Sequence, residues 1–166
     1  MLVTSPRTWD PETAADIWMG DSMRIAEILR RKGSDVAMVA PDTTIRSLLA
    51  TLAEHNIGAV VVSRDGEGIV GIISERDVVR NLHARGAELL DTPVSEIMTT
   101  DVRTCAPDDR VDGLRNTMTE HRIRHLPVID QGRLIGIVSI GDVVKSAISE
   151  LTTERQHLVE YLQGKY

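Results

Sequence analysis

Aromatic residues are scarce in this chain of 166 residues: they make up 2% of it, and none is phenylalanine. The aromatic side chains are Trp9, Trp18, Tyr161 and Tyr166, so residues 19–160 contain no aromatic ring. The core of that stretch must therefore be built from Val, Ile, Leu, Met and Ala. A ring-shaped ligand bound there would have to be held by aliphatic groups.

Other features are also missing. The single cysteine, Cys105, excludes an internal disulfide and a thiolate zinc site. Charged residues interrupt the first 23 residues, so they lack the apolar stretch of a signal peptide. The longest apolar runs, such as residues 69–73, are far shorter than the roughly 20 residues that span a bilayer. A net charge of −6 argues against a nucleic-acid partner. We therefore expect a soluble, cytoplasmic protein that binds neither nucleic acid nor membrane.

Signatures of catalysis are absent as well. The sequence contains no G-x-S-x-G, Walker A or C-x-x-C motif. Residues 66–71 match G-x-G-x-x-G, but they precede a strand instead of opening a helix, so they do not predict a dinucleotide site. His121 and His125 are four residues apart, with no third metal ligand evident. We expect no catalytic residues, no metal and no required cofactor.

The strongest positive signal is an internal repeat. Ala-Pro-Asp at residues 40–42 recurs at residues 106–108, displaced by 66. The pattern of Gly-Ile, Ser and Asp-Val-Val within residues 71–79 recurs within residues 136–144, displaced by 65. A Glu-Ile pair near the start of each copy is displaced by 69. Several anchors in the same order indicate a tandem duplication.

Each copy has the same predicted order of elements, with helices recognised by their apolar spacing and strands by β-branched runs. In the first copy we expect a helix near 23–31, a strand at 36–39, a helix from 41 to about 52, strands at 59–62 and 69–73 joined by an Asp-Gly turn, and a helix at 75–85. In the second copy we expect strands at 102–105, 125–129 and 134–138, with helices at 110–121 and from 139. Residues 154–165 have a further helical pattern, which predicts packing on the module or on a partner chain.

The runs GIISERDVVR at residues 71–80 and GIVSIGDVVK at residues 136–145 resemble the signature of cystathionine β-synthase (CBS) domains, and HRIRHLPV at residues 121–128 resembles the strand before it. The resemblance covers about residues 23–147. It implies an α/β (α+β) fold of two β-α-β-β-α CBS repeats related by pseudo-twofold symmetry, flanked by N- and C-terminal helices. The similarity is to the stand-alone bacterial form of the pair, called a Bateman module. The expected divisions are a leader with a short helix at 1–22, CBS domain 1 at 23–88, CBS domain 2 at 89–149 and a C-terminal helix at 150–166.

The duplicated Ser-x-x-Asp motif is the centre of the predicted ligand site. A strand delivers Ser and Asp to a helix N-terminus, where free backbone N–H groups favour an anion. By resemblance, Asp77 and Asp142 bind ribose, and Ser74 and Ser139 meet ribose or phosphate. The competing interpretation is that both motifs are capping boxes that only start helices. The two roles can coexist.

The copies differ where a phosphate would lie. Copy one has Arg76 beside Asp77, whereas copy two has Gly141. Copy two has Arg124 and His125 at the start of its strand, positions that resemblance places near phosphate. Copy two is therefore expected to hold a charged tail, while copy one would need Arg76 or residues lent by the other copy. The alternative is that these basic residues are simply solvated. The hypothesis is two inequivalent sites.

The base would be held between aliphatic side chains, or these side chains would be ordinary core. The positions that match the family's adenine pocket are Val36, Val102, Ala59, Val60, Leu126 and Pro127.

The resemblance implies a regulatory sensor that binds an adenosine-containing effector: AMP, ATP, NAD(H) or S-adenosylmethionine. The alternative is an interaction module with degenerate pockets and no ligand. An enzyme fragment is disfavoured because no nucleophile with a base is evident. The expected partners are the ligand, a second copy of the chain paired through CBS-domain helices, and a target protein.

Overall fold

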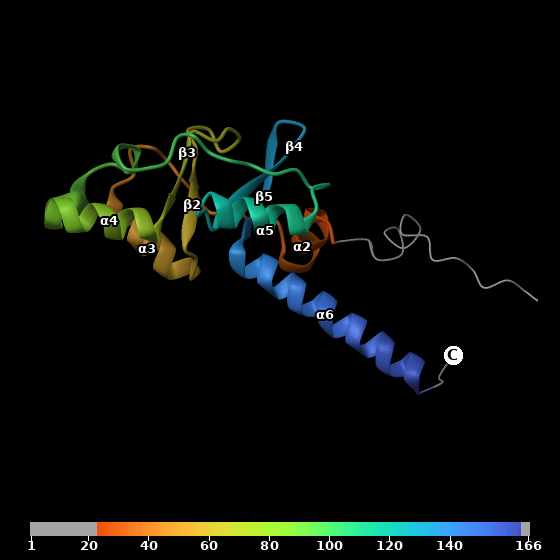
Figure 1. Ribbon diagram of the computed structural model, residues 1–166. Helices are drawn as coiled ribbons and strands as arrows, with labels where there is room; N and C mark the ends of the chain where they lie inside the picture. Colours follow the sequence, from red (N-terminus) through yellow and green to blue (C-terminus); the bar gives the residue numbers. More distant parts are fainter. Residues whose placement is uncertain (1–22, 164–166) are drawn as a thin grey trace, which may run out of the picture.

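The computed structural model describes residues 23–163, which form two lobes side by side, each with a small sheet flanked by helices (Figure 1). The elements in chain order are α2 (Ile25–Lys32), β1 (Met38–Val39), α3 (Ile45–His55), β2 (Ala59–Val62), β3 (Gly71–Ser74), α4 (Glu75–Arg85), the 3₁₀ helices η1 (Gly86–Asp91) and η2 (Val94–Glu96), α5 (Val111–Glu120), β4 (His125–Asp130), β5 (Arg133–Ser139) and α6 (Ile140–Leu162). The predicted α+β fold of two repeats is confirmed.

The sheet of the first lobe has the order β1-β2-β3, with β1 parallel to β2 and β2 antiparallel to β3. All four residues of β2 are buried, which explains their unbroken apolar run. The register places Ala59 opposite Ser74. The last residue of β3 therefore lies at the edge of the lobe where β2 begins, and α4 starts there.

The second lobe has only a two-stranded sheet, β4-β5, with His125 opposite Ser139. The predicted strand at 102–105 is wrong: only Cys105 pairs, as an isolated bridge to Val128. Arg103 and Thr104 are exposed, whereas Cys105 is buried. Of these three residues, therefore, only Cys105 is fixed by packing. The predicted strand at 36–39 likewise shortens to β1.

Each lobe is completed by a segment that belongs to the other repeat in sequence. Leu89 and Val94, which follow the first repeat's last helix, are fully buried in the first core. The N-terminal α2 instead packs into the second core, where Ile25 is fully buried. Backbone hydrogen bonds fix both exchanges, from Val94 N to Thr43 O at 2.8 Å and from Ala26 N to Pro107 O at 2.8 Å.

This exchange was not predicted. Because of it, the residues that form each lobe are not the same as the residues of each repeat along the sequence. The boundaries at 22/23, 88/89 and 149/150 stay predictions. In space, however, residues 25–32 belong with the second lobe, and residues 89–98 belong with the first. The expected helix at 1–22 lies outside the described residues.

Helix α6 runs unbroken for 23 residues and projects beyond the second lobe (Figure 1). Residues 150–162 of the expected C-terminal helix are helical, and they continue the helix that Ser139 starts. Its apolar side chains Leu151, Leu158 and Leu162 are 66%, 64% and 82% exposed, so they do not pack on the module. None of the helices between residues 23 and 163 is long and apolar enough to cross a membrane.

Candidate ligand-binding cleft

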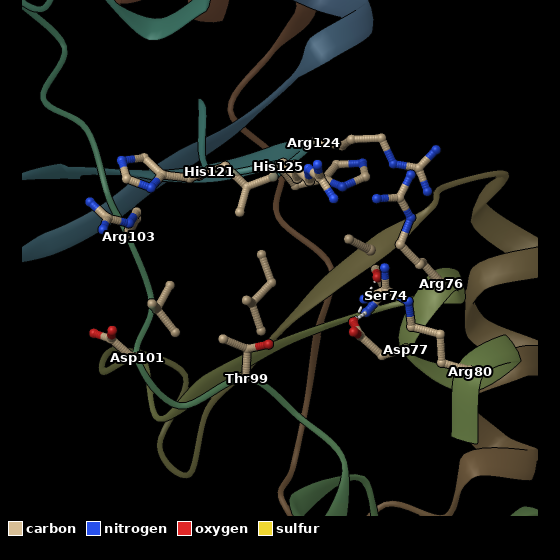
Figure 2. A pocket seen from close by; sticks show the side chains of 15 residues that line it. Ser74, Arg76, Asp77, Arg80, Thr99, Asp101, Arg103, His121, Arg124 and His125 are labelled. Carbon is tan, nitrogen blue, oxygen red and sulfur yellow. Dashed lines mark hydrogen bonds between the residues drawn. The ribbon is translucent and has the colours of Figure 1, made fainter. Parts of the chain in front are cut away.

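A cleft of about 420 Å³ lies between the two lobes (Figure 2). It is formed by the end of β3 and the start of α4, by residues 99–103 of the connecting segment, and by residues 121–125 between α5 and β4. The lining residues are Ala59, Ile72, Ser74, Arg76, Asp77, Arg80, Thr99, Asp101, Val102, Arg103, His121, Arg122, Ile123, Arg124 and His125. The cleft is thus built from both repeats.

Ser74 and Asp77 form a tight pair on one wall of the cleft. The backbone N–H of Ser74 donates to Asp77 Oδ2 at 2.9 Å, and the Ser74 hydroxyl donates to the same oxygen at 2.6 Å. This is the predicted capping arrangement at the start of α4. No donor to Asp77 Oδ1 occurs among residues 23–163, so the capping contacts leave one carboxylate oxygen toward the cleft. Capping and ligand binding are therefore compatible at this residue.

The cleft is positively charged although the whole chain carries a net charge of −6. Two aspartates, Asp77 and Asp101, line it together with five arginines: Arg76, Arg80, Arg103, Arg122 and Arg124. In Figure 2, Arg76 and Arg124 lie at one end, and Arg103 and Asp101 lie at the other. A low-dielectric wall focuses the field of such a cluster, so anions are attracted to the cleft.

His125 adds a titratable group to this environment. Its burial and the nearby Arg124 lower its pKa below the ordinary value of 6.5, against an opposing effect of Glu75. Arg124 itself approaches Glu75, with its Nη2 at 3.9 Å from Oε1. The lowered pKa favours the neutral imidazole, so the arginines supply the positive charge of the cleft.

The structure brings together seven of the predicted site residues in this cleft: Ser74, Arg76, Asp77, Arg124, His125, Ala59 and Val102. Arg124 and His125 line the cleft together with the aspartate of copy one. His125 also lies opposite Ser139, and the charge of Asp142 acts on its pKa, so it borders the second motif as well. The physical reason is that β4 begins at the junction of the lobes. Its first residues therefore border the neighbouring repeat's helix, as in the alternative that residues are lent by the other copy.

Four predicted base-pocket positions do not line the cleft. Val60 is fully buried in the first core, and Leu126 is 1% exposed in the second. Pro127 is also buried, and its carbonyl accepts a hydrogen bond from Cys105 N at 3.0 Å. Val36 is half-buried away from the cleft. For Val60 and Leu126, core packing explains the apolar side chain.

The second motif, Ser139 and Asp142, lies elsewhere, beside α2. Ser139 donates to Asp142 Oδ2 through its N–H and its hydroxyl, both at 2.8 Å. The same oxygen also accepts from Lys32 Nζ at 2.7 Å. The Lys32 ammonium and these hydrogen bonds lower the pKa of Asp142 against the opposing effect of burial, which is the largest contribution.

Several lining residues were missed as ligand contacts. Arg80 follows Arg76 at helical i, i+4 spacing, which puts both on one face of α4. Arg103 follows Val102, and the expected alternation of a strand would have turned it away from the base pocket. The remaining missed positions are Ile72, Thr99, Asp101, His121, Arg122 and Ile123. Arg122 could have been predicted from its position two residues before Arg124 in the same basic stretch. An exposed, solvated arginine explained that position equally well.

The candidate metal ligands of the described residues do not gather at one point. Within residues 23–163, no group of three or more His, Cys, Asp or Glu side chains is placed to hold a metal ion. Cys105, outside the cleft, is buried, and burial raises the pKa of its thiol to about 12.

Comparisons with known proteins agree with the duplicated motif. The CBS-domain family model matches residues 25–84 and 94–149. A mitochondrial CBS domain-containing protein of Arabidopsis thaliana is 36% identical over 154 residues, covering 88% of this chain and 75% of the relative. The CBS domain-containing protein YhcV of Bacillus subtilis is 34% identical, covering 73% of this chain and 83% of its own.

Solved structures match the fold as well. A CBS-domain-containing protein of Agrobacterium tumefaciens is 44% identical with a TM-score of 0.74, covering 75% of this chain and 99% of its own. The CBS domain pair of protein MJ0100, solved in complex with 5′-methylthioadenosine and S-adenosyl-L-methionine, is 26% identical with a TM-score of 0.66. That match covers 74% of this chain and 98% of the other.

Proposed function

Because the chain belongs to the CBS-domain family, with two such domains in tandem, we propose that it is a regulatory module that binds an adenosine-containing ligand with a phosphate tail. The binding site is the cleft at Asp77, between the lobes. The single observation that carries this proposal is the meeting of a partly free carboxylate with five arginines in one cleft.

The carboxylate suits a ribose. Asp77 Oδ2 is held by Ser74, which fixes the side chain and leaves Oδ1 as an acceptor for a ribose hydroxyl. A hydrogen bond to a charged group contributes about 1.5–3 kcal/mol when it is well formed. The rigid pair therefore supplies an oriented acceptor without the entropy cost of ordering a free side chain.

The apolar lining suits a base held without aromatic stacking. Ala59, Ile72, Val102 and Ile123 supply aliphatic surface on several sides of the cleft. The scarcity of aromatic residues is consistent with this, since no ring lies between residues 19 and 160. Recognition of the adenine edge would then fall to backbone groups of residues 99–103.

The charge of the cleft discriminates among the adenosyl candidates. AMP, ATP and NAD(H) carry phosphates, which arginines bind through paired, charge-assisted hydrogen bonds. S-adenosylmethionine carries a sulfonium cation, which the arginine cluster repels. Protein MJ0100 binds that ligand, but five arginines against two aspartates favour a phosphate ligand here.

The regulatory part of the proposal follows from the position of the cleft. A ligand held by Asp77 of one lobe and Arg124 of the other favours the arrangement of lobes that satisfies both contacts. It shifts the population of conformers by its difference in affinity between them. The ligand acts as an effector, not a catalytic cofactor. A homodimer in the cytoplasm, pairing through CBS-domain helices, is part of this proposal.

A second candidate is a protein-interaction module without a ligand. The observation that favours it is the row of exposed apolar side chains on α6, including Ile148 and Leu151. This function and ligand sensing are compatible, because a sensor needs a surface that reports its state.

Thermal unfolding with a panel of AMP, ADP, ATP, NAD, NADH and S-adenosylmethionine tests the proposal. We expect a phosphate ligand at about 100 times its Kd to stabilise the fold by about 2.7 kcal/mol. Asp77→Asn should abolish the shift while keeping a polar group in the cap, and Asp142→Asn should leave it intact. Mass spectrometry of the purified protein would identify a retained ligand. Stabilisation by no member of the panel would favour the interaction module.

A further inference from the structure

Two glycines define which residues occupy equivalent places in the two lobes. A Cβ added to Gly71 would lie 2.6 Å from Met98 Sδ, and one added to Gly136 would lie 2.6 Å from Leu29 Cδ2. Leu29 and Met98 therefore occupy the same position relative to their sheets, displaced by 69 residues. The Glu-Ile pairs at 27 and 96 have this displacement too.

The same displacement relates Lys32 to Asp101. Asp101 lines the cleft at Asp77, whereas Lys32 donates directly to Asp142 at 2.7 Å. The charge at this position is thus reversed between the two sites. Within the described part of the chain, Asp77 Oδ2 accepts only the two bonds from Ser74, whereas Asp142 Oδ2 accepts those of Ser139 and the ammonium.

The Lys32–Asp142 pair is well placed to persist. The side chains are 31% and 20% exposed, so solvent screens the pair less than a fully exposed one. Lys32 also lies in the last turn of α2, where the helix dipole favours a cation. Among residues 23–163 no donor to Asp142 Oδ1 occurs, as at Asp77, so the two carboxylates differ in the ammonium at Oδ2. A ribose diol that donates to both oxygens of Asp142 would have to compete with this ammonium at Oδ2.

We propose that Lys32 determines which of the two sites accepts ligand, by holding its ammonium against Oδ2 of the carboxylate that would bind a second ribose. The chain then binds one adenosyl ligand, at Asp77. This inference rests on the proposed function and adds the reason for a stoichiometry of one. According to this proposal, the two sites differ because of a residue on α2, and not because their Ser-x-x-Asp motifs differ.

The surroundings of the second site define the probe. The residues displaced by 66 from Arg103, Arg122 and Arg124 are Ala37, Asn56 and Gly58, none of which is charged. Arg31 and Lys145 nevertheless lie near Asp142, so a phosphate ligand could bind there without the ribose contact. Adenosine itself is the appropriate probe, because it requires the ribose contact and no arginine.

The experiment measures adenosine binding by titration calorimetry in an Asp77→Asn background, which removes the first site. We expect no binding in Asp77→Asn alone. Adding Lys32→Met should create one site, with an affinity gain of about tenfold or more, equivalent to at least 1.4 kcal/mol. Adding Asp142→Asn should abolish that site again. Arg31→Met, which removes the neighbouring charge in the same turn of α2, is the matched control and should create none.

Thermal unfolding of each variant verifies that it is folded, and the pKa of Asp142 followed by NMR gives a readout without ligand: it should rise in Lys32→Met. The proposal is overturned if Asp77→Asn alone still binds adenosine, or if folded Lys32→Met in that background binds none. If Asp77→Asn alone binds adenosine and Lys32→Met weakens that binding, Lys32 is a ligand contact at the second site and the proposal is wrong. Failure of the unaltered chain to bind any member of the nucleotide panel would instead overturn the proposed function.

Discussion

Arg122 and Asn56 occupy the same left-handed backbone position just beyond α5 and α3, with φ angles of 54° and 51°. In both copies the backbone N–H of the next residue donates a hydrogen bond to a carbonyl in the last turn of the helix. These bonds run from Ile123 N to Met118 O and from Ile57 N to Leu52 O, each at 3.0 Å. Asparagine tolerates this conformation, whereas other side chains with a Cβ pay about 1–2 kcal/mol for it. The second copy therefore carries strain at a residue that lines the ligand cleft.

Replacing Arg122 with Asn, the residue of the equivalent position, should stabilise the fold and weaken ligand binding. We expect a gain of about 0.5–1 kcal/mol in the free energy of unfolding, because the strain is relieved. Affinity for ADP should fall several-fold, because one phosphate partner is lost. Urea unfolding and titration calorimetry measure the two effects. Equal or tighter binding of ADP would show that Arg122 does not face the ligand.

His125 should make stability depend on pH. Burial and Arg124 lower its pKa in the folded chain, while Glu75 opposes them, so below the ordinary value of 6.5 the unfolded chain binds the proton and the folded chain does not. The stabilising contribution is complete above pH 6.5 and is lost as pH falls toward the folded pKa, by at most about 1.4 kcal/mol per pH unit. Denaturation between pH 7.5 and 5 should show a shallower loss in His125→Gln. Parallel curves for the two proteins would contradict the lowered pKa.

Three glycine substitutions should separate close packing from helix propensity. Gly71→Ala should destabilise by about 1–3 kcal/mol, because its Cβ would lie 3.0 Å from the Thr99 carbonyl oxygen as well as against Met98. Gly136→Ala should cost less, since only the Leu29 side chain must move. Gly113→Ala in α5 meets nothing within 4 Å and should stabilise by about 0.5–1 kcal/mol. Chemical denaturation gives the order. A Gly71→Ala protein as stable as the parent would contradict the exchanged packing of residues 94–99.

Helix α6 should mediate the proposed homodimer. Five of its exposed apolar residues recur with the alternating spacing of three and four that coiled coils use, interrupted once by Arg155. They are Val144, Ile148, Leu151, Leu158 and Leu162. The double change Leu151→Glu and Leu158→Glu should give a monomer in light scattering after size exclusion, whereas Gln156→Glu, off this stripe, should not. A dimer that survives the double change would assign the contact to other helices.

The sequence determined the elements whose cause is local. The run Ala59–Val62 is a strand because β-branched residues form a buried pleated surface, and Ser74 and Ser139 start helices because their motifs supply the cap within four residues. The duplicated motif resembles the CBS-domain signature, and the family match confirms that resemblance. The strand predicted at 102–105 does not form, because a strand also needs a partner along its length and a face to bury.

The tertiary structure decided which residues meet. Repeat spacing could pair Arg124 with Asp77 or with Asp142, since both distances along the chain are compatible with a compact fold. The junction of the lobes places Arg124 in one cleft with Asp77, and the exchange of α2 brings Lys32 to Asp142. Capping is a local interaction that the sequence encodes, whereas the charge of a cleft is the sum of groups brought together by packing. For this reason the two Ser-x-x-Asp motifs could be read from the sequence, and the difference between their surroundings could not.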